Sequence, residues 1–168
     1  LVNWDIKLQT AVSDLEVINE EKDGYLYHLK YKVVDSNEFI TVATTRPETF
    51  FGDSAVCINP NDERYKHLLG KKVTLPMINK EIPIIQDEIV DTDFGTGCLK
   101  ITPAHDFNDY KIGKKHNLEF INILNKDGSM NKNVDKKYIG MNIHEIRDNL
   151  VKDLDDIGVF VEKVPYKT

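Results

Sequence analysis

The sequence predicts one mixed α/β domain that is rich in β-structure and has about three helices. Period-two alternation of apolar residues recurs in several short segments, which is typical of strands. Helical periodicity with capping residues occurs in only a few places. A chain of 168 residues can bury roughly two thirds of the surface that its unfolded form exposes. We therefore expect residues 1–168 to fold as a single domain, although periodicity alone does not determine the order of its strands.

Four strands are expected in the first part of the chain. Residues 14–20 and 25–33 suit a hairpin, because the turn sequence at residues 22–24 separates them. Alternate positions of the second strand share one face and are apolar or aromatic: Tyr25, Tyr27, Leu29, Tyr31 and Val33. Residues 38–45 follow a turn and form the third strand, and the fourth surrounds Cys57.

The middle of the chain is expected to contain one helix and several short strands. Asn59-Pro60 has the residue types of an N-cap followed by the first helical position, and the helix should end near Gly70. Residues 73–90 should form short strands, because two prolines interrupt them: Pro76 and Pro83.

Glycine, proline and aspartate residues mark the boundaries of the strand-to-helix junction that follows. The glycine-flanked segment 94–97 precedes a strand through Leu99 and Ile101, which Pro103 ends. Asp106 has the residue type of an N-cap, so the second helix should begin there.

The third helix is expected at residues 143–157. Asn142 and Glu145 suggest a capping box, and Gly158 should end the helix. Its apolar stripe has helical spacing: Ile143, Ile146, Leu150, Leu154 and Ile157. Residues 159–164 should form a final strand.

Charge and cysteine content limit the classes of function. The formal charge of −6 argues against a basic nucleic-acid-binding surface, so any contact with RNA should be local. Cys57 and Cys98 lie in apolar runs and are expected to be reduced thiols of a cytoplasmic protein. No apolar run is long enough for a membrane span, and no signal peptide is recognisable. Because the chain begins at Leu1, we expect it to be a domain of a longer protein.

Two segments carry an unusual density of polar groups. TVATTRPET, residues 41–49, has more hydroxyls than a strand end needs. FGTGCLKITPAHDFND, residues 94–109, places a lysine, threonines, a histidine and two carboxylates around one strand-to-helix junction. Each feature also has a plain structural explanation, since Asp106 and Asp109 suit the first turn of any helix. Common catalytic signatures are absent and the histidines lack zinc-ligand spacing, so we expect no metal.

These segments resemble the inserted editing domain of valyl-tRNA synthetases. The matching stretches occur in the same order and spacing: ATTRPET (43–49), NPNDERY (59–65), EIPII (81–85), DFGTGCLKITPAHDFNDY (93–110) and NKDGSMN (125–131). Isoleucyl domains carry tryptophan and further threonines in place of Arg46-Pro47-Glu48 and histidine at the position of Lys100, where leucyl domains usually have methionine. The combination therefore favours the valyl class.

The resemblance implies a barrel-like editing domain of the class Ia synthetases that hydrolyses threonine wrongly esterified to the valine tRNA. It implies four catalytic residues, Thr44, Thr45, Lys100 and Asp109, and six substrate-binding residues, Arg46, Thr49, Phe94, Thr102, His105 and Asp106. Asp109, kept ionised by its helix N-terminus, would accept the ammonium or the hydroxyl of the substrate, with Asp106 close by.

The other implied roles concern the walls of the site. Phe94 would pack on the substrate or the terminal adenosine, and Lys100 would hold a polar substrate group or a carboxylate. The threonines, with Arg46, would hold the terminal ribose and the attacking water.

The resemblance also implies the partners of the domain. Editing would need no cofactor, whereas ATP and Mg²⁺ would belong to the catalytic core of the parent enzyme. The partners would be the 3′-aminoacylated end of the tRNA and the rest of the synthetase in cis, to which residues 1–13 and 159–168 would connect; the isolated domain should be monomeric. Alternatives are an isoleucyl or leucyl editing domain, a catalytically silent insert that positions the tRNA, and a free-standing RNA-binding module, which the acidic charge disfavours.

Overall fold

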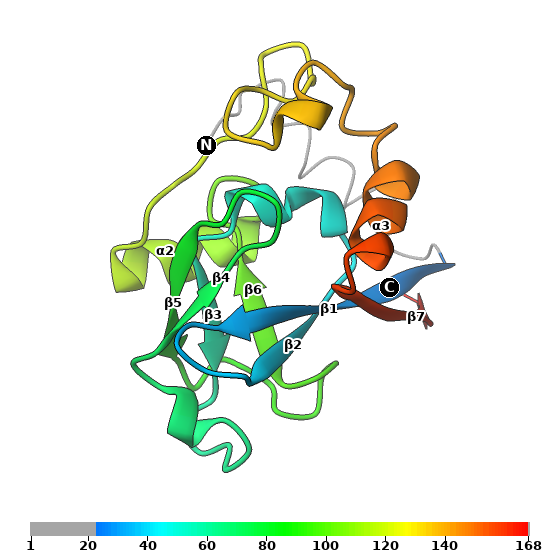
Figure 1. The fold of residues 1–168 in the computed structure, drawn as a ribbon. Helices are drawn as coiled ribbons and strands as arrows, with labels where there is room; N and C mark the ends of the chain where they lie inside the picture. Colours follow the sequence, from blue (N-terminus) through cyan, green and yellow to red (C-terminus); the bar gives the residue numbers. More distant parts are fainter. Residues whose placement is uncertain (1–22, 168) are drawn as a thin grey trace.

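The computed structural model describes residues 23–167 and shows a strand-rich mixed fold (Figure 1). Its strands are β1 (Asp23–Val33), β2 (Phe39–Thr44), β3 (Ala55–Ile58), β4 (Lys72–Thr74), β5 (Glu81–Gln86), β6 (Cys98–Ile101) and β7 (Phe160–Lys167). The helices within the described residues are the α-helices α2 (Phe107–His116) and α3 (Arg147–Asp156) and the 3-10 helices η1 (Pro47–Gly52), η2 (Lys66–Leu68) and η3 (Lys136–Tyr138).

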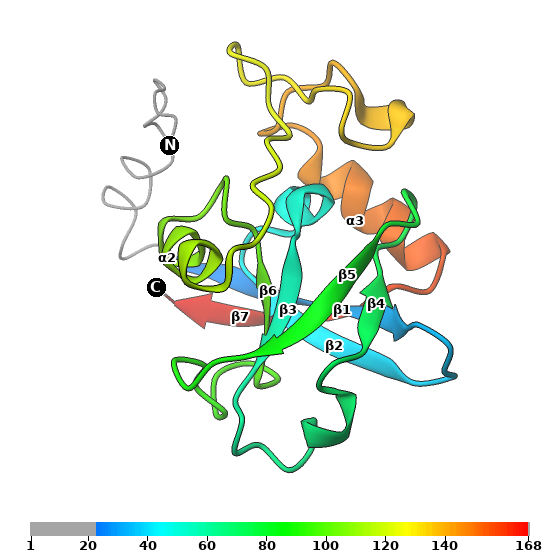
Figure 2. The ribbon, with the colours of Figure 1, turned by 90° about the vertical axis from the view of Figure 1, so that its left-hand side faces the viewer.

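The strands form one strongly curved sheet with the order β2-β1-β4-β5-β3-β6, and β7 pairs with β1. The pairs are antiparallel except for β3 and β5, which run parallel. The two ends of this order approach each other, because β2 lies close to β6 and the Thr96 hydroxyl donates to the Thr41 carbonyl at 2.5 Å. The sheet is therefore a nearly closed barrel, as the family resemblance implied, with α2 and α3 on different sides of it (Figures 1 and 2).

Strand β1 is shared by three neighbours. It pairs with β2 along one edge, and with β7 and the end of β4 along the other. The pairing with β7 begins at Asp23 opposite Lys167, so residues 23 and 24 lie in a strand and the turn predicted for residues 22–24 is wrong. The predicted partner strand, residues 14–20, lies outside the described residues.

The alternation in β1 is confirmed over most of its length. Leu29, Tyr31 and Val33 are fully buried, whereas Tyr25 at the sheet margin is 44% exposed. The three buried side chains join the main core with residues of β2, η1, β3 and α3: Val42, Phe50, Phe51, Val56, Leu150 and Leu154. Period-two burial of apolar surface thus determines which face of β1 points inward.

The helix predicted from Asn59 to Gly70 is wrong. This region contains turns and the short η2, because side chains bind the nearby backbone in place of a helical ladder. The Asn59 side-chain oxygen accepts from the Asn61 N–H at 2.8 Å, and the Asp62 carboxylate accepts from the Arg64 N–H at 3.1 Å.

The third predicted helix is real but shorter than expected. Helix α3 begins at Arg147 and has no side-chain cap, since the Asn142 side chain accepts from the His144 N–H in a local turn instead. The predicted capping box is therefore wrong. Most of the apolar stripe is buried, although Ile157 is 54% exposed, and Gly158 follows the helix with a φ of 82°.

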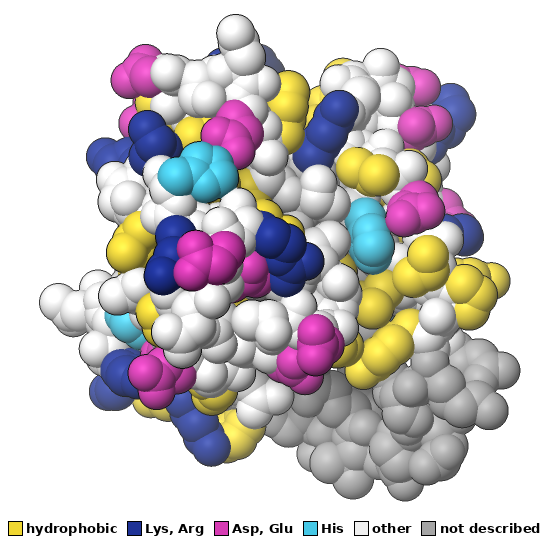
Figure 3. Space-filling view, turned by 90° about the horizontal axis from the view of Figure 1, so that it is seen from below, with side chains coloured by type: hydrophobic (Ala, Val, Ile, Leu, Met, Phe, Trp, Pro, Cys, Tyr) yellow, Lys and Arg dark blue, Asp and Glu magenta, His cyan; other side chains and the backbone are white. Residues whose placement is uncertain are grey.

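Charged side chains of both signs are interspersed on the face of the domain shown in Figure 3. The described part of this face therefore carries no continuous basic stripe. The expectation that contacts with RNA are local stays a prediction.

Candidate functional site

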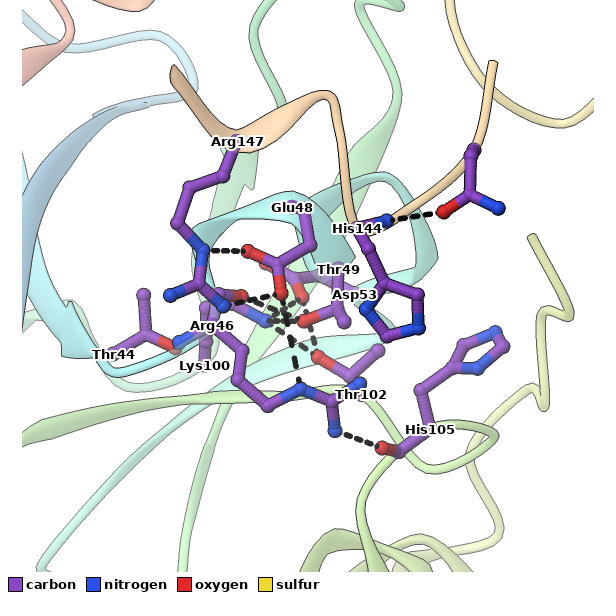
Figure 4. Close-up of polar contacts among 11 residues, drawn as sticks. Thr44, Arg46, Glu48, Thr49, Asp53, Lys100, Thr102, His105, His144 and Arg147 are labelled. Atoms are coloured by element: carbon purple, nitrogen blue, oxygen red, sulfur yellow. Dashed lines mark hydrogen bonds and ion pairs between the residues drawn. The ribbon is translucent and has the colours of Figure 1, made fainter. Parts of the chain in front are cut away.

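The two polar segments picked out in the sequence, residues 41–49 and 94–109, meet in space, although 44 residues separate them in the chain. Closure of the barrel brings the end of β2 and η1 beside β6 and the start of α2. Three hydrogen bonds join the segments directly. Arg46 Nη1 donates to the His105 carbonyl at 2.7 Å and Lys100 Nζ donates to Thr49 Oγ1 at 3.0 Å (Figure 4). The third is the bond from the Thr96 hydroxyl to the Thr41 carbonyl.

Lys100 lies in a buried network centred on Asp53. Its ammonium donates to Asp53 Oδ1 at 2.7 Å and to Thr102 Oγ1 at 2.6 Å, in addition to Thr49. The three N–H donors of the ammonium are therefore all used within the protein. Lys100 thus holds a carboxylate of the domain itself, and a direct contact with substrate stays a prediction.

Asp53 is completely buried, and three side chains donate hydrogen bonds to it. Besides Lys100, its partners are the Thr102 hydroxyl at 2.7 Å and the Tyr31 hydroxyl at 2.8 Å, while Lys100 and Thr102 share Oδ1. Burial raises the pKa of Asp53, and the Lys100 charge and the hydrogen bonds oppose this rise. A buried pair with satisfied hydrogen bonds fixes β6 relative to the segment between η1 and β3, since breaking the pair leaves a charge without compensation.

Sequence reasoning missed Asp53 as a residue of the candidate site. The available signal was a single carboxylate within the otherwise neutral, largely apolar run 49–58, because an acid buried there requires a partner. Its partners lie 22 residues before it and 47 and 49 residues after it, so spacing alone could not identify them.

The two carboxylates of α2 differ in their surroundings. Asp106 caps the helix as predicted, since Oδ1 accepts from the Asp109 N–H at 3.0 Å. Asp109 Oδ2 accepts from the Thr102 N–H at 2.9 Å. Burial, and then the nearby Asp106 charge, raise the pKa of Asp109 to about 7. Asp109 is therefore only partly ionised at neutral pH, unlike the expectation that the helix N-terminus keeps it charged.

The threonine-rich strand end is stabilised by its own hydroxyls. Thr44 Oγ1 accepts from the Arg46 N–H at 3.0 Å, and the Thr49 hydroxyl donates to the Arg46 carbonyl at 3.0 Å. Both bonds shape the bend that leads into Pro47, while Thr44 and Thr45 remain half-buried. Roles for these hydroxyls toward a ribose or a water stay predictions.

Phe94 and His105 have different neighbours in the structure. Phe94 packs edge to face on Tyr166 of β7, with ring centroids 5.8 Å apart, and the adjacent Gly95 passes against Ala43 of β2. His105 Nε2 accepts from the Ile123 N–H at 3.0 Å, and burial lowers the pKa of His105 to about 3. His105 is therefore neutral and carries its proton on Nδ1.

A second buried carboxylate, Glu48, lies beside the site. It accepts from Arg147 Nε and Nη2, each at 2.7 Å, so that helix α3 is joined to η1. These side chains line a cleft of about 350 Å³ with Ile143, His144, Glu145 and Asp148. Glu48 Oε2 also lies 4.0 Å from Arg46 Nε, so this cleft adjoins the strand end that carries Arg46 (Figure 4).

Residues 23–167 contain no group of three histidine, cysteine or acidic side chains placed to hold a metal ion. In the same part of the chain, no helix has the length and apolar character needed to cross a membrane.

Residues 63–151 match the family model described as the leucyl-tRNA synthetase editing domain. The chain belongs to this family of synthetase editing domains. The match covers more than half of the chain and includes the junction that carries Lys100, Asp106 and Asp109.

Curated relatives place this editing domain with the valyl enzymes. It is 57% identical to valine–tRNA ligase of Legionella pneumophila (strain Paris) and 55% identical to that of Francisella tularensis (strain SCHU S4), each over 99% of the chain. The domain spans only 18% of the length of either relative. The valyl resemblance seen in the sequence is therefore confirmed at the level of the domain.

A solved structure has the same fold. The chain is similar, with a TM-score of 0.69 and 19% identity, to a LeuRS of Agrobacterium radiobacter K84 solved in a ternary complex with tRNA and LeuAMS. The similarity covers 94% of this chain and 22% of that one. At this identity the comparison confirms the fold of the editing domain and nothing finer.

Proposed function

We propose that this editing domain hydrolyses threonine wrongly esterified to the valine tRNA, as part of a longer valine–tRNA ligase in the cytoplasm. Threonine is nearly isosteric with valine, and an apolar pocket cannot strongly reject an added hydroxyl. Valyl synthetases are the established example of this limit, with only about a hundredfold discrimination. A second site that reads the hydroxyl is therefore needed.

The observation that carries the proposal is the meeting of the threonine-rich strand end with the start of α2 across the Lys100–Asp53 network. Thr102 links the two: its side chain belongs to the network, while its N–H holds Asp109. The carboxylate of Asp109 is therefore placed accurately at the edge of a rigid, charge-balanced core. Such placement suits recognition of the ammonium or the hydroxyl of threonine, with Asp106 the alternative partner for either group.

The proposed reaction needs positioning rather than a strong base. A water held by Thr44, Thr45 and Arg46 attacks the ester carbonyl, the bond to the ribose oxygen breaks, and threonine and a free ribose hydroxyl result. An aminoacyl ester is already activated, and donors placed near the developing oxyanion lower the barrier further. Hydrolysis uses no cofactor in this proposal, while ATP and Mg²⁺ serve amino-acid activation elsewhere in the parent enzyme.

The test is deacylation of threonine-charged valine tRNA by the whole synthetase, with and without Asp109→Ala. The intact enzyme should release threonine, and the substitution should slow release by at least tenfold while aminoacylation with valine is unchanged. Asp91→Asn, which changes an exposed carboxylate in the loop before β6, serves as the matched control. If the intact enzyme does not hydrolyse the ester, the alternative of a catalytically silent insert that positions the tRNA explains the domain better.

A further inference from the structure

Glu48 is a buried acid whose charge must be compensated by its neighbours. Its side chain is 7% exposed, and the two hydrogen bonds from Arg147 form a bidentate pair between residues 99 positions apart. The Arg147 guanidinium also lies over the Tyr27 ring, with its Cζ atom 5.8 Å from the ring centroid, and this contact restrains its orientation. Arg147 therefore has its position on α3 and its contact on β1, and it is not one of the predicted catalytic residues.

The same carboxylate has a second cationic neighbour within the site. Arg46 Nε lies 4.0 Å from Glu48 Oε2, while Arg46 Nη1 donates to the His105 carbonyl at 2.7 Å. Arg46 therefore makes its short contact across the site and only a long one to Glu48. Arg46 is free to bind the His105 carbonyl because Arg147 already donates a hydrogen bond to each carboxylate oxygen of Glu48.

We propose that Arg147 is a positioning residue for editing, which acts by keeping Glu48 occupied so that Arg46 stays bound to the His105 carbonyl. Without Arg147, the buried Glu48 carboxylate has Arg46 as its nearest cation and draws it away from the loop that precedes α2. The strand end and the start of α2 then lose a direct link, although neither Arg147 nor Glu48 belongs to the predicted set of catalytic and substrate-binding residues. This inference rests on the proposed function.

The activity test compares Arg147→Met and the double variant Arg147→Met/Glu48→Gln in the full synthetase. The single variant should lower kcat for threonine release by about tenfold to a hundredfold, with KM for the charged tRNA changed less than about threefold. The double variant should recover most of the rate, because it has no unpaired carboxylate to capture Arg46. A purely structural role predicts the opposite, since the double variant removes still more of the ion pair.

Lys137→Met is the matched control, because it also removes an ion pair to α3, formed with Asp153 at 2.7 Å, but lies away from the site. It should leave kcat unchanged. An equal loss of kcat in this control, or no recovery in the double variant, would overturn the inference.

A second measurement does not depend on hydrolysis. Amide hydrogen exchange at residues 105–109 should become faster in Arg147→Met and return toward the parent rate in the double variant. If the intact synthetase fails to release threonine, the proposed function fails but this exchange pattern still tests the positioning role. Unchanged exchange in Arg147→Met refutes that role whatever the activity.

Discussion

The raised pKa of Asp109 predicts that the editing domain is less stable because of this carboxylate. An acid whose pKa is higher in the folded protein binds its proton more tightly there, so folding is favoured at low pH. This stability is fully present below the unfolded pKa of about 3.9 and is lost as pH rises through the folded pKa of about 7. The amide introduced by Asp109→Asn cannot ionise, and its oxygen can still accept from the Thr102 N–H. This substitution should therefore remove the contribution of Asp109 to the pH dependence of stability.

The magnitude follows from the change in pKa. A rise from 3.8 to about 7 corresponds to about 4 kcal/mol as an upper limit, of which about 2 to 3 kcal/mol is lost between pH 5 and pH 8. The free energy of unfolding of Asp109→Asn, relative to the parent chain, should therefore rise by about that amount over this interval. Titrating groups that do not interact with Asp109 are common to both proteins and cancel in the comparison, whereas Asp106, whose charge acts on Asp109, contributes to the difference.

The assay is chemical denaturation of both chains at several pH values from 5 to 8, with Asp91→Asn as the control that should show no such trend. The same Asp109→Asn substitution should abolish threonine release by the full synthetase, since a neutral amide cannot pair with an ammonium group. A difference in stability that is flat with pH, or a variant that is less stable at pH 8, would refute the assigned cause. The expected combination, a more stable but inactive protein, is typical of a functional carboxylate held at a cost in stability.

Two further substitutions test other parts of the site. Replacing both Thr44 and Thr45 with valine should preserve the strand and lower the free energy of unfolding by about 1 kcal/mol, because the hydrogen bond from the Arg46 N–H is lost. The double variant should release threonine at least tenfold more slowly. Thr41→Val on the same strand is the control and should leave release unchanged. Loss of far-ultraviolet circular dichroism in the double variant would instead assign these threonines to structure. Lys100→Met should destabilise the domain by about 3 to 5 kcal/mol in urea denaturation, because Asp53 loses its only cationic partner among the described residues, and a cost below about 1 kcal/mol would contradict the network.

Local signals in the sequence predicted local structure well. The capping role of Asp106, the end of α3 before Gly158 and the buried face of β1 all depend on residues within a few positions of one another. Where local signals competed, prediction failed: the side chain of Asn59 suits an N-cap and an Asx turn equally, and the turn is formed.

The site was predicted only in part, because its physics is not local. Both polar segments were visible, but the ion pairs that hold them, Lys100 with Asp53 and Arg147 with Glu48, join residues 47 and 99 positions apart. Burial also reversed one expectation. Desolvation, and then the Asp106 charge, raise the pKa of Asp109, and desolvation cannot be read from the order of residues.

The pairing of Asp23 with Lys167 matters for any longer protein that contains this domain between two of its own segments. Paired antiparallel strands lie only about 5 Å apart, so the chain enters and leaves the described region at almost one point. Within such a longer protein, the folded domain acts as a short loop between the two flanking segments. The entropy cost of bringing those segments together is then that of a few residues rather than of the whole inserted length. Sequence changes within the barrel can therefore accumulate with little strain on the host, provided that β1 and β7 remain paired.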